Sequence, residues 1–177
     1  MSKQISLDAV IRKVPDFPKC GVLFYDITGI LVCPEAFRYC INTMISIYRH
    51  EKIDAVAAIE SRGFIFAAPF AEKLGIPLIL VRKKGKLPGK TYSCTYQLEY
   101  GEAELEVQVA DVQRGQQILV LDDLIATGGT LKAAQTVLEE GGATVREFFG
   151  VVGLPFLKYQ EVLAPVPVRT LVEYHGE

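Results

Sequence analysis

The apolar positions of this chain fall into short runs separated by helix-forming stretches, and that order predicts an alternating α/β fold. Mainly apolar runs, typical of strands buried on both faces, occupy residues 53–59, 76–81, 118–121 and 145–152. Helix-forming stretches occupy residues 34–50, 63–74 and 130–140. Because strands that alternate with helices pair in parallel, we expect a mostly parallel central sheet flanked by helices.

The expected element ends carry recognisable start and stop signals. Pro34 suits the first position of a helix, and Gly75 suits the residue that closes one. Near the amino end, Ser6 is expected to cap a short helix over residues 6–13, which the prolines within residues 15–18 then break.

A hairpin interrupts the α/β alternation. Residues 91–100 and 104–109 alternate in the manner of two antiparallel strands, with a turn between them. The nine residues from 82 to 90 hold five cations: Arg82, Lys83, Lys84, Lys86 and Lys90. An antiparallel insert preceded by a basic loop is typical of a flap over an active site. We therefore expect a flap over about residues 83–109.

Two carboxylates and a small-residue loop follow the third apolar run. Asp122 and Asp123 are expected where that strand ends, and residues 126–130 then open a helix. A helix N-terminus offers unpaired N–H groups to a phosphate, and paired carboxylates suit hydroxyl groups or a divalent cation on the same ligand. The loop has neither the P-loop spacing nor the dinucleotide fingerprint. The alternative is an ordinary capped turn.

A second anion site is indicated after the first apolar run, where Ser61 and Arg62 precede a helix. A hydroxyl and a guanidinium at that place suit a pyrophosphate. Taken alone, the two residues favour a capped helix with a solvated arginine, but alongside residues 122–130 the pyrophosphate site is the better interpretation. The basic loop also has alternative interpretations: it could be an ordinary solvated loop or an RNA-binding surface. At the carboxyl edge of a parallel sheet, a polyphosphate is its better ligand.

Composition narrows the class of protein. The chain has 177 residues, half of them hydrophobic, which suits one globular domain over residues 1–177. A net charge of −2 favours neither nucleic acid nor an anionic membrane as a partner. The sequence shows no signal-peptide core and no apolar run long enough to span a bilayer. Four cysteines without a Cys-x-x-Cys spacing argue against zinc and for a reducing, cytoplasmic location.

Taken together, these segments resemble the adenine phosphoribosyltransferases, a branch of the type I phosphoribosyltransferases. The residues that carry the resemblance are 15–18, 21–28, 61–64, 82–89, 98–101, 103–106 and 120–130. The resemblance implies the type I phosphoribosyltransferase fold, with a small N-terminal hood over about residues 1–33 and the flap. It also implies a purine salvage reaction with Mg²⁺, in which phosphoribosyl diphosphate (PRPP) and adenine give AMP and pyrophosphate.

The same resemblance implies roles for individual residues. The 5-phosphate would be held by Ala126, Thr127, Gly128, Gly129 and Thr130. The ribose hydroxyls would bind Asp122 and Asp123, directly or through Mg²⁺ that is held mainly by the substrate. Pyrophosphate would be bound by Ser61, Arg62, Arg82, Lys83 and Lys86, some of them from a partner subunit of a homodimer. Adenine would be read by Leu23, Phe24 and Tyr25.

Glu99, in the flap, would act at purine N7 and accept the proton that adenine loses. Its neighbours Glu102, Glu104 and Glu106 are expected to face solvent, and only the resemblance separates Glu99 from them.

Two positions refine the expected substrate. Ala126 stands where enzymes for 6-oxopurines carry an aspartate, which argues against hypoxanthine and guanine. Tyr25 stands where several family members have arginine, so base contact there is expected from the backbone. Residues 153–158 match the family poorly and receive no role. The alternatives are a PRPP- or purine-sensing regulator of the same fold and a phosphoribosyltransferase for another base.

Overall fold

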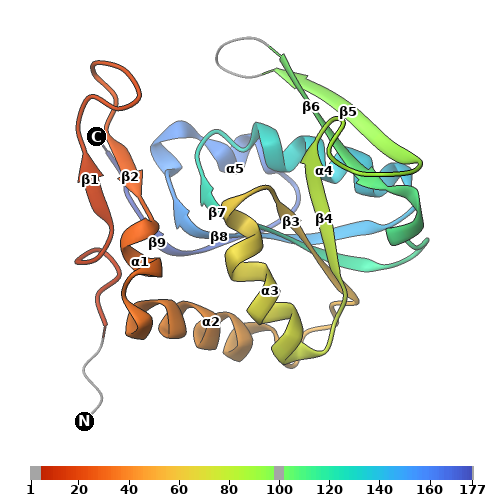
Figure 1. The fold of residues 1–177 in the computed structure, drawn as a ribbon, viewed down its shortest axis with the longest axis horizontal. Helices are drawn as coiled ribbons and strands as arrows, with labels where there is room; N and C mark the ends of the chain where they lie inside the picture. Colours follow the sequence, from red (N-terminus) through yellow and green to blue (C-terminus); the bar gives the residue numbers. More distant parts are fainter. Residues whose placement is uncertain (1–4, 98–101, 177) are drawn as a thin grey trace.

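A seven-stranded sheet forms the centre of the molecule, and a two-stranded sheet lies beside it (Figure 1). The computed structural model describes residues 5–97 and 102–176. The strand order in the large sheet is β5-β6-β4-β3-β7-β8-β9. Its parallel strands are β3 (Ala55–Ile59), β4 (Leu78–Lys83), β7 (Gln117–Ile125), β8 (Thr144–Gly153) and β9 (Val168–Glu173). The predicted parallel sheet is therefore confirmed.

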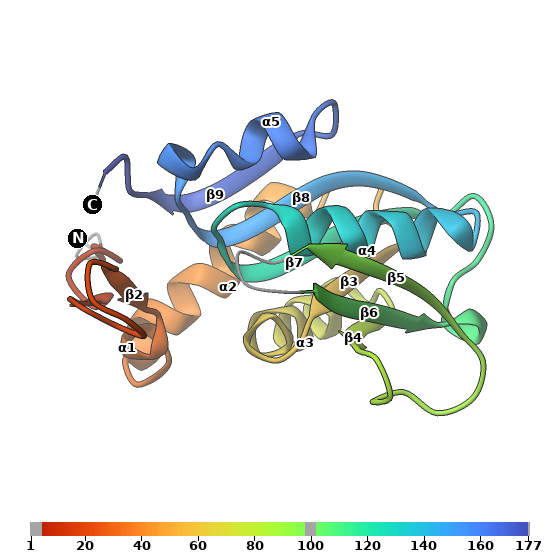
Figure 2. The same cartoon turned by 90° about the horizontal axis from the view of Figure 1, so that it is seen from above.

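Helices cover both faces of this sheet (Figure 2). The longer helices are α2 (Pro34–Tyr48), α3 (Arg62–Leu74) and α4 (Gly129–Glu140). All five residues of β3 are buried, and alternate ones enter two separate apolar cores. Val56 and Ala58 pack with α2 and α3, whereas Ala57 and Ile59 pack with α4. Burial on both faces is the physical reason for the unbroken apolar runs in the sequence.

The order of the strands creates a crevice at one edge of the sheet. From β3 the chain passes through α3 to β4 on one side, and it later returns to β7 on the other side of β3. Loops that leave neighbouring strands in opposite directions leave a crevice between them, which is where open α/β sheets bind ligands. Here the loops after β3 and β7 flank it.

The hairpin extends the sheet at its edge. Strand β5 (Thr91–Gln97) pairs antiparallel with β6 (Glu102–Gln108), as predicted, and β6 in turn pairs antiparallel with β4. The β4–β6 register places Arg82 opposite Glu106 and Lys83 opposite Leu105. The hairpin and the basic loop are therefore joined to the central sheet. Glu99 lies outside the described residues.

The amino-terminal part differs from the prediction. Residues 6–13 do not form a helix: they make one turn, with Ile11 N–H bonded to the Leu7 carbonyl at 3.0 Å, and then enter β1 (Arg12–Val14). Strand β1 pairs with β2 (Phe24–Asp26), and α1 (Thr28–Leu31) follows. So short a helix gains little from its own hydrogen bonds, and pairing with β2 prevails. We call residues 5–33 the hood.

Three further elements were not predicted. They are the 3₁₀ turn η1 (Val109–Asp111), the 3₁₀ turn η2 (Pro155–Leu157) and helix α5 (Tyr159–Leu163). Strand β9 was likewise not predicted. Strand β7 continues to Ile125, so Asp122 and Asp123 lie inside the strand and not after its end. The β7–β8 ladder carries on through Asp122 and Ile125, which explains the extension.

Candidate active site

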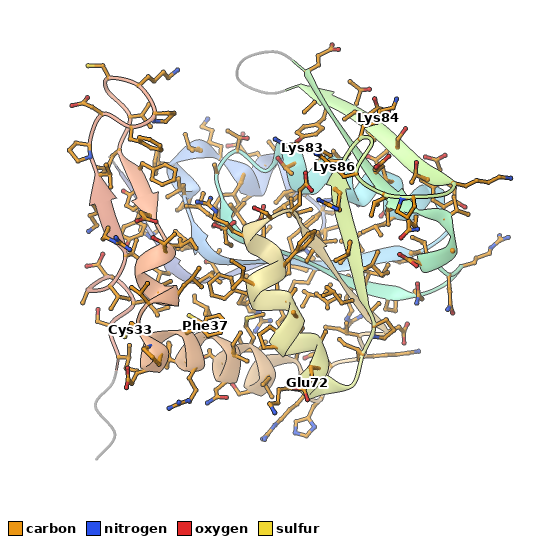
Figure 3. All side chains as sticks on the ribbon, in the orientation of Figure 1. Cys33, Phe37, Glu72, Lys83, Lys84 and Lys86 are labelled. Atoms are coloured by element: carbon orange, nitrogen blue, oxygen red, sulfur yellow. The ribbon has the colours of Figure 1, made fainter. Side chains whose placement is uncertain are left out.

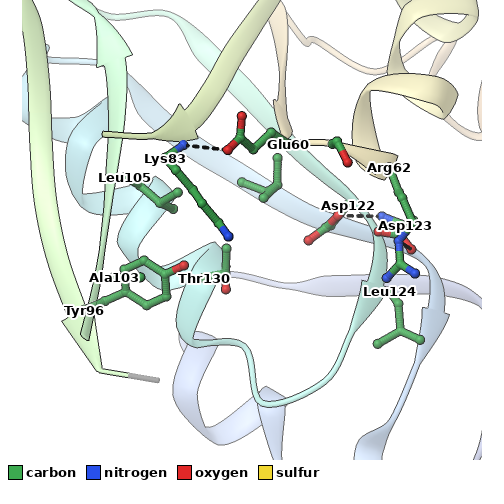
Figure 4. Close-up of a pocket in the computed structure, with 12 residues that line it drawn as sticks. Glu60, Arg62, Lys83, Tyr96, Ala103, Leu105, Asp122, Asp123, Leu124 and Thr130 are labelled. Carbon is green, nitrogen blue, oxygen red and sulfur yellow. Dashed lines mark hydrogen bonds and ion pairs between the residues drawn. The ribbon is translucent and has the colours of Figure 1, made fainter. Parts of the chain in front are cut away.

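A cavity of about 360 Å³ opens at the carboxyl ends of β3 and β7, beneath the hairpin (Figure 4). Six of the predicted site residues line it: Ser61, Arg62, Lys83, Asp122, Asp123 and Thr130. Glu60 from the end of β3 and Tyr96 from β5 also line it, although no role was expected for either. The cavity therefore joins the two predicted anion sites into one.

The two aspartates differ in their surroundings. Asp123 is only 4% exposed, and its Oδ2 lies 2.9 Å from Arg62 Nε. That contact is an ion pair without hydrogen-bond alignment, so among the described residues Asp123 Oδ2 has no hydrogen-bond partner. Asp122 Oδ1 accepts a bond of 2.8 Å from the Asp123 N–H. The pair keeps acceptor capacity for a ligand.

Burial sets the protonation of this pair. Loss of solvation and the neighbouring Asp123 charge raise the pKa of Asp122 well above its ordinary value. Burial also raises the pKa of Asp123, against the opposing effects of its bond with Asp122 and of Arg62. A hydroxyl group or a cation at this place would favour the charged form of both carboxyls.

The loop after β7 forms a small second cavity of about 90 Å³ next to the first. Ala126, Thr127, Gly128 and Thr130 line it, and Gly129 begins α4. Gly128 has a φ of +85°, and a Cβ there would lie 3.1 Å from Leu163 Cγ of α5. The turn thus requires glycine, and α5 packs directly against it. The result is a helix N-terminus that opens into a phosphate-sized hollow.

The predicted cations are only partly brought together. Lys83 lines the large cavity, and its side chain extends into it in the direction of Thr130 (Figure 4). Arg82 is engaged elsewhere: its Nε lies 2.7 Å from Glu60 Oε2, and its Nη1 donates to the Lys86 carbonyl at 3.1 Å. Arg82 and Lys86 are not among the residues that line the cavity. Figure 3 shows Lys83, Lys84 and Lys86 gathered around the loop after β4.

Glu106 corrects the expectation that the flap glutamates face solvent. Its side chain is buried, with 4% of the residue exposed, and its Oε1 accepts bonds of 2.9 Å from the N–H groups of Lys86 and Leu87. Burial opposes its charge, but these backbone bonds hold the pKa of Glu106 below its ordinary value. Strand alternation did not reveal this, because the basic loop folds back over that face of β6.

The hood carries the predicted base-reading residues. The Phe24 ring lies 5.9 Å from the Arg62 guanidinium, so it faces the cavity side of the hood. Tyr25 is 3% exposed and stacks on Tyr174, with ring centroids 4.1 Å apart. The Tyr25 side chain therefore packs inside the protein, and Leu23 is partly buried beside the same core.

Comparisons with known proteins agree with this geometry. A family model described as a phosphoribosyl transferase domain matches residues 28–152. An adenine phosphoribosyltransferase from Treponema denticola is 68% identical over 171 residues, which are 97% of this chain and 90% of that protein.

Solved structures are similar over almost the same extent. The crystal structure of adenine phosphoribosyltransferase from Thermoanaerobacter pseudethanolicus has a TM-score of 0.91 at 40% identity, covering 95% of this chain and 98% of that one. The Saccharomyces cerevisiae enzyme, complexed with adenine and an imino-altritol bisphosphate, has a TM-score of 0.87 at 37% identity, covering 93% and 96%. The fold, the crevice and this extent of sequence identity show that the chain belongs to the adenine phosphoribosyltransferase family.

Proposed function

We propose that this chain transfers the 5-phosphoribosyl group of PRPP to adenine, giving AMP and pyrophosphate in purine salvage. The observation that carries the proposal is the single cavity in which Asp122, Asp123 and Thr130 meet Ser61, Arg62 and Lys83. A ligand with a phosphate, sugar hydroxyls and a diphosphate matches this sequence of groups. Family membership and the adenine-bound yeast relative support the choice of base.

Each group of residues has a proposed task. The loop formed by Ala126, Thr127, Gly128, Gly129 and Thr130 holds the 5-phosphate through N–H groups and hydroxyls. Asp122 and Asp123 accept bonds from the ribose hydroxyls. Ser61, Arg62 and Lys83 bind the pyrophosphate within this cavity.

Arg82 and Lys86 need a different placement. Arg82 is held by Glu60, and neither cation lines the cavity of its own chain. We propose that the chain forms a homodimer, in which these two residues serve pyrophosphate binding from the partner side. The family resemblance supports this assembly.

The reaction breaks the bond between the anomeric carbon and the pyrophosphate oxygen, and adenine N9 forms the new bond. Negative charge grows on the departing pyrophosphate and positive charge on the ribose. Arg62 and Lys83 stabilise the first charge, and the carboxylates of Asp122 and Asp123 tolerate the second. Because Asp123 holds the Arg62 guanidinium at 2.9 Å and Glu60 holds the Lys83 N–H at 3.1 Å, little reorganisation is needed as the charge develops.

The residues present fit Mg²⁺. Mg²⁺ prefers oxygen ligands and is commonly held by one or two carboxylates together with substrate phosphates. Asp122 and Asp123 offer such oxygens, and Asp123 Oδ2 lacks a hydrogen-bond partner in the described structure. Within residues 5–97 and 102–176 no cluster of three or more metal-binding side chains occurs. We therefore propose that Mg²⁺ would be held mainly by PRPP and pyrophosphate, with Asp122 and Asp123 as candidate protein ligands, and would supply positive charge opposite the leaving group.

The base would lie against the hood. Phe24 offers its ring to the adenine plane, and the backbone at Leu23 and Tyr25 offers polar groups to its edge. Glu99 is proposed to accept the proton from adenine through N7. Ala126, in place of an acid, favours a 6-amino over a 6-oxo purine.

We place the protein in the cytoplasm as one domain. Its four cysteines are unpaired, as is usual in a reducing compartment. No helix in the described part of the chain has the length and apolarity to cross a bilayer.

Pyrophosphate release from PRPP, measured with a panel of bases, tests the proposed function. We expect release with adenine and Mg²⁺ and none with hypoxanthine or guanine. Release with hypoxanthine but not adenine would contradict the choice of base. Binding of PRPP without release for any base would favour a sensing protein of the same fold instead.

A further inference from the structure

The buried carboxylate of Glu106 lies where the flap hairpin meets the basic loop. We propose that Glu106 is a positioning residue for the pyrophosphate end of the site: it fixes the loop of residues 84–90 to the hairpin, and this fixes Lys83 in the cavity. The inference rests on the proposed function, and it adds a residue that makes no contact with substrate.

Glu106 is bonded in a way that is unusual for an acidic strand residue. Its Oε1 accepts from the N–H groups of both Lys86 and Leu87 at 2.9 Å, and its Oε2 lies 3.4 Å from the Thr91 hydroxyl. Its partners in the described structure are thus backbone donors and a hydroxyl, although three lysines, Lys84, Lys86 and Lys90, lie in the adjacent loop. An anion held by successive N–H groups fixes the shape of the loop that supplies them.

Nearer its two ends the loop is also bonded to the hairpin: the Lys84 N–H donates to the Glu104 carbonyl at 2.9 Å, Gln108 Nε2 to the Pro88 carbonyl at 2.9 Å, and the Val109 N–H to the Lys90 carbonyl at 3.0 Å. It contains no helix or strand between Lys83 and Thr91, and two of its glycines, Gly85 and Gly89, each have a φ of +80°. Its lysines repel one another. Against this repulsion, the bonds from the Lys86 and Leu87 N–H groups to Glu106 hold the middle of the loop.

A chain of bonds leads from Glu106 to the cavity. Lys86 donates its N–H to Glu106, and its carbonyl accepts a bond of 3.1 Å from Arg82 Nη1. Arg82 Nε lies 2.7 Å from Glu60 Oε2, and Glu60 Oε1 accepts from the Lys83 N–H at 3.1 Å. Glu60 and Lys83 both line the cavity. Without the bonds to Glu106, the Lys86 carbonyl that accepts from Arg82 would be less well fixed. The positions of Arg82, of Glu60 and of the Lys83 backbone would then be less well fixed in turn.

Glu104 provides the matched comparison on the same strand. It is partly exposed, and its Oε1 accepts a bond of 2.8 Å from the Lys84 side chain. The carboxylate of Glu104 therefore pairs with a side chain, whereas the carboxylate of Glu106 binds the backbone of the loop. An exposed pair of this kind contributes little to stability. Glu104→Gln changes the same charge two residues away without touching the anchor.

The test measures two ligands separately on each variant. Calorimetric titration with pyrophosphate and MgCl₂ reports the loop side of the site, and titration with ribose 5-phosphate reports residues 122–130. We expect Glu106→Ala to weaken pyrophosphate binding roughly tenfold, as loss of a buried bonded group implies, and to leave ribose 5-phosphate binding within about twofold. Glu104→Gln should match the unmodified protein for both ligands.

Two milder substitutions separate position from charge. Glu106→Gln keeps the reach and one acceptor oxygen for both N–H groups, so we expect near-normal pyrophosphate binding. Glu106→Asp keeps the charge but is one methylene too short, so we expect weakened binding. The reverse order would overturn the inference, as would normal pyrophosphate binding in Glu106→Asp and Glu106→Ala.

The same titrations distinguish this inference from the proposed function. If the unmodified protein binds ribose 5-phosphate but no pyrophosphate, the proposed pyrophosphate site itself is wrong. If it binds both and the Glu106 variants do too, only the positioning role fails. Thermal unfolding of each variant identifies any that do not fold, and the Gln and Asp pair then still decides the question.

Discussion

Gly128 makes the turn from β7 into α4, and we expect Gly128→Ala to weaken phosphate binding. The residue has a φ of +85°, a conformation that costs an L-amino acid about 1–2 kcal/mol. The added Cβ would also lie 3.1 Å from Leu163 Cγ and 3.3 Å from Tyr159 Cβ, both in α5. Those neighbours have to move by a few tenths of an ångström, and the turn moves with them.

Gly115 gives the control for the backbone part of this cost. It has a φ of +82°, but a Cβ added there would meet no atom within 4 Å. Gly115→Ala should therefore lower the free energy of unfolding by about 1–2 kcal/mol. Gly128→Ala should lower it by that amount plus about 1–3 kcal/mol for overpacking against α5.

The assay combines denaturant unfolding with titration of ribose 5-phosphate. We expect Gly128→Ala to weaken ribose 5-phosphate binding by about tenfold, equal to about 1.4 kcal/mol, and Gly115→Ala to leave it unchanged. Equal stability losses in the two variants, with normal ligand binding in both, would refute the reasoning that α5 supports the phosphate loop.

Three other changes give separate expectations. Glu99→Leu should lower turnover by on the order of 10²–10⁴-fold and leave PRPP binding nearly intact; near-normal turnover in steady-state assays would remove Glu99 from the mechanism. Burial raises the pKa of Asp122 in the folded protein above the value of 3.8 expected in the unfolded chain. The protonated carboxyl therefore stabilises the fold fully below pH 3.8, and this contribution is lost as the pH rises through the pKa of the folded state. Asp122→Asn should therefore raise the free energy of unfolding more at neutral pH than near pH 3.8, and equal gains at both would contradict this. Tyr174→Ala removes the ring stacked on Tyr25 and should raise KM for adenine by up to about tenfold, with KM for PRPP unchanged; Tyr174→Phe keeps the ring and serves as control.

The parallel sheet and the cavity at its edge were predictable from sequence. Apolar runs such as residues 53–59 specify strands buried on both faces, and the carboxyl ends of such strands meet at one edge. The proximity of residues at or near those ends, such as Ser61 and Asp123, can therefore be predicted without knowing any long-range contact. The structure confirms that they line one cavity.

Features that depend on contacts distant in sequence were not predictable. Glu106 looks solvent-facing by alternation, but the loop that buries it lies about twenty residues earlier in the chain. Tyr25 stacks on a residue that follows it by about 150 positions. The prediction of a helix over residues 6–13 was wrong because the pairing of β1 with β2, a contact between separate segments, outweighs local helix capping.

The hood has its own two-stranded sheet, and neither strand pairs with the central sheet. The proposed phosphoribosyl groups lie on the large sheet, whereas the proposed base-reading residues lie on the small one. The ring of the base is therefore proposed to lie against a separately paired sheet, whereas Ala126, which bears on the choice of purine, lies in the phosphate loop after β7. A substitution in the hood or in its packing on Tyr174 would therefore alter contact with the base and leave the large sheet unchanged, whereas a substitution at Ala126 would affect the base and the phosphate loop together.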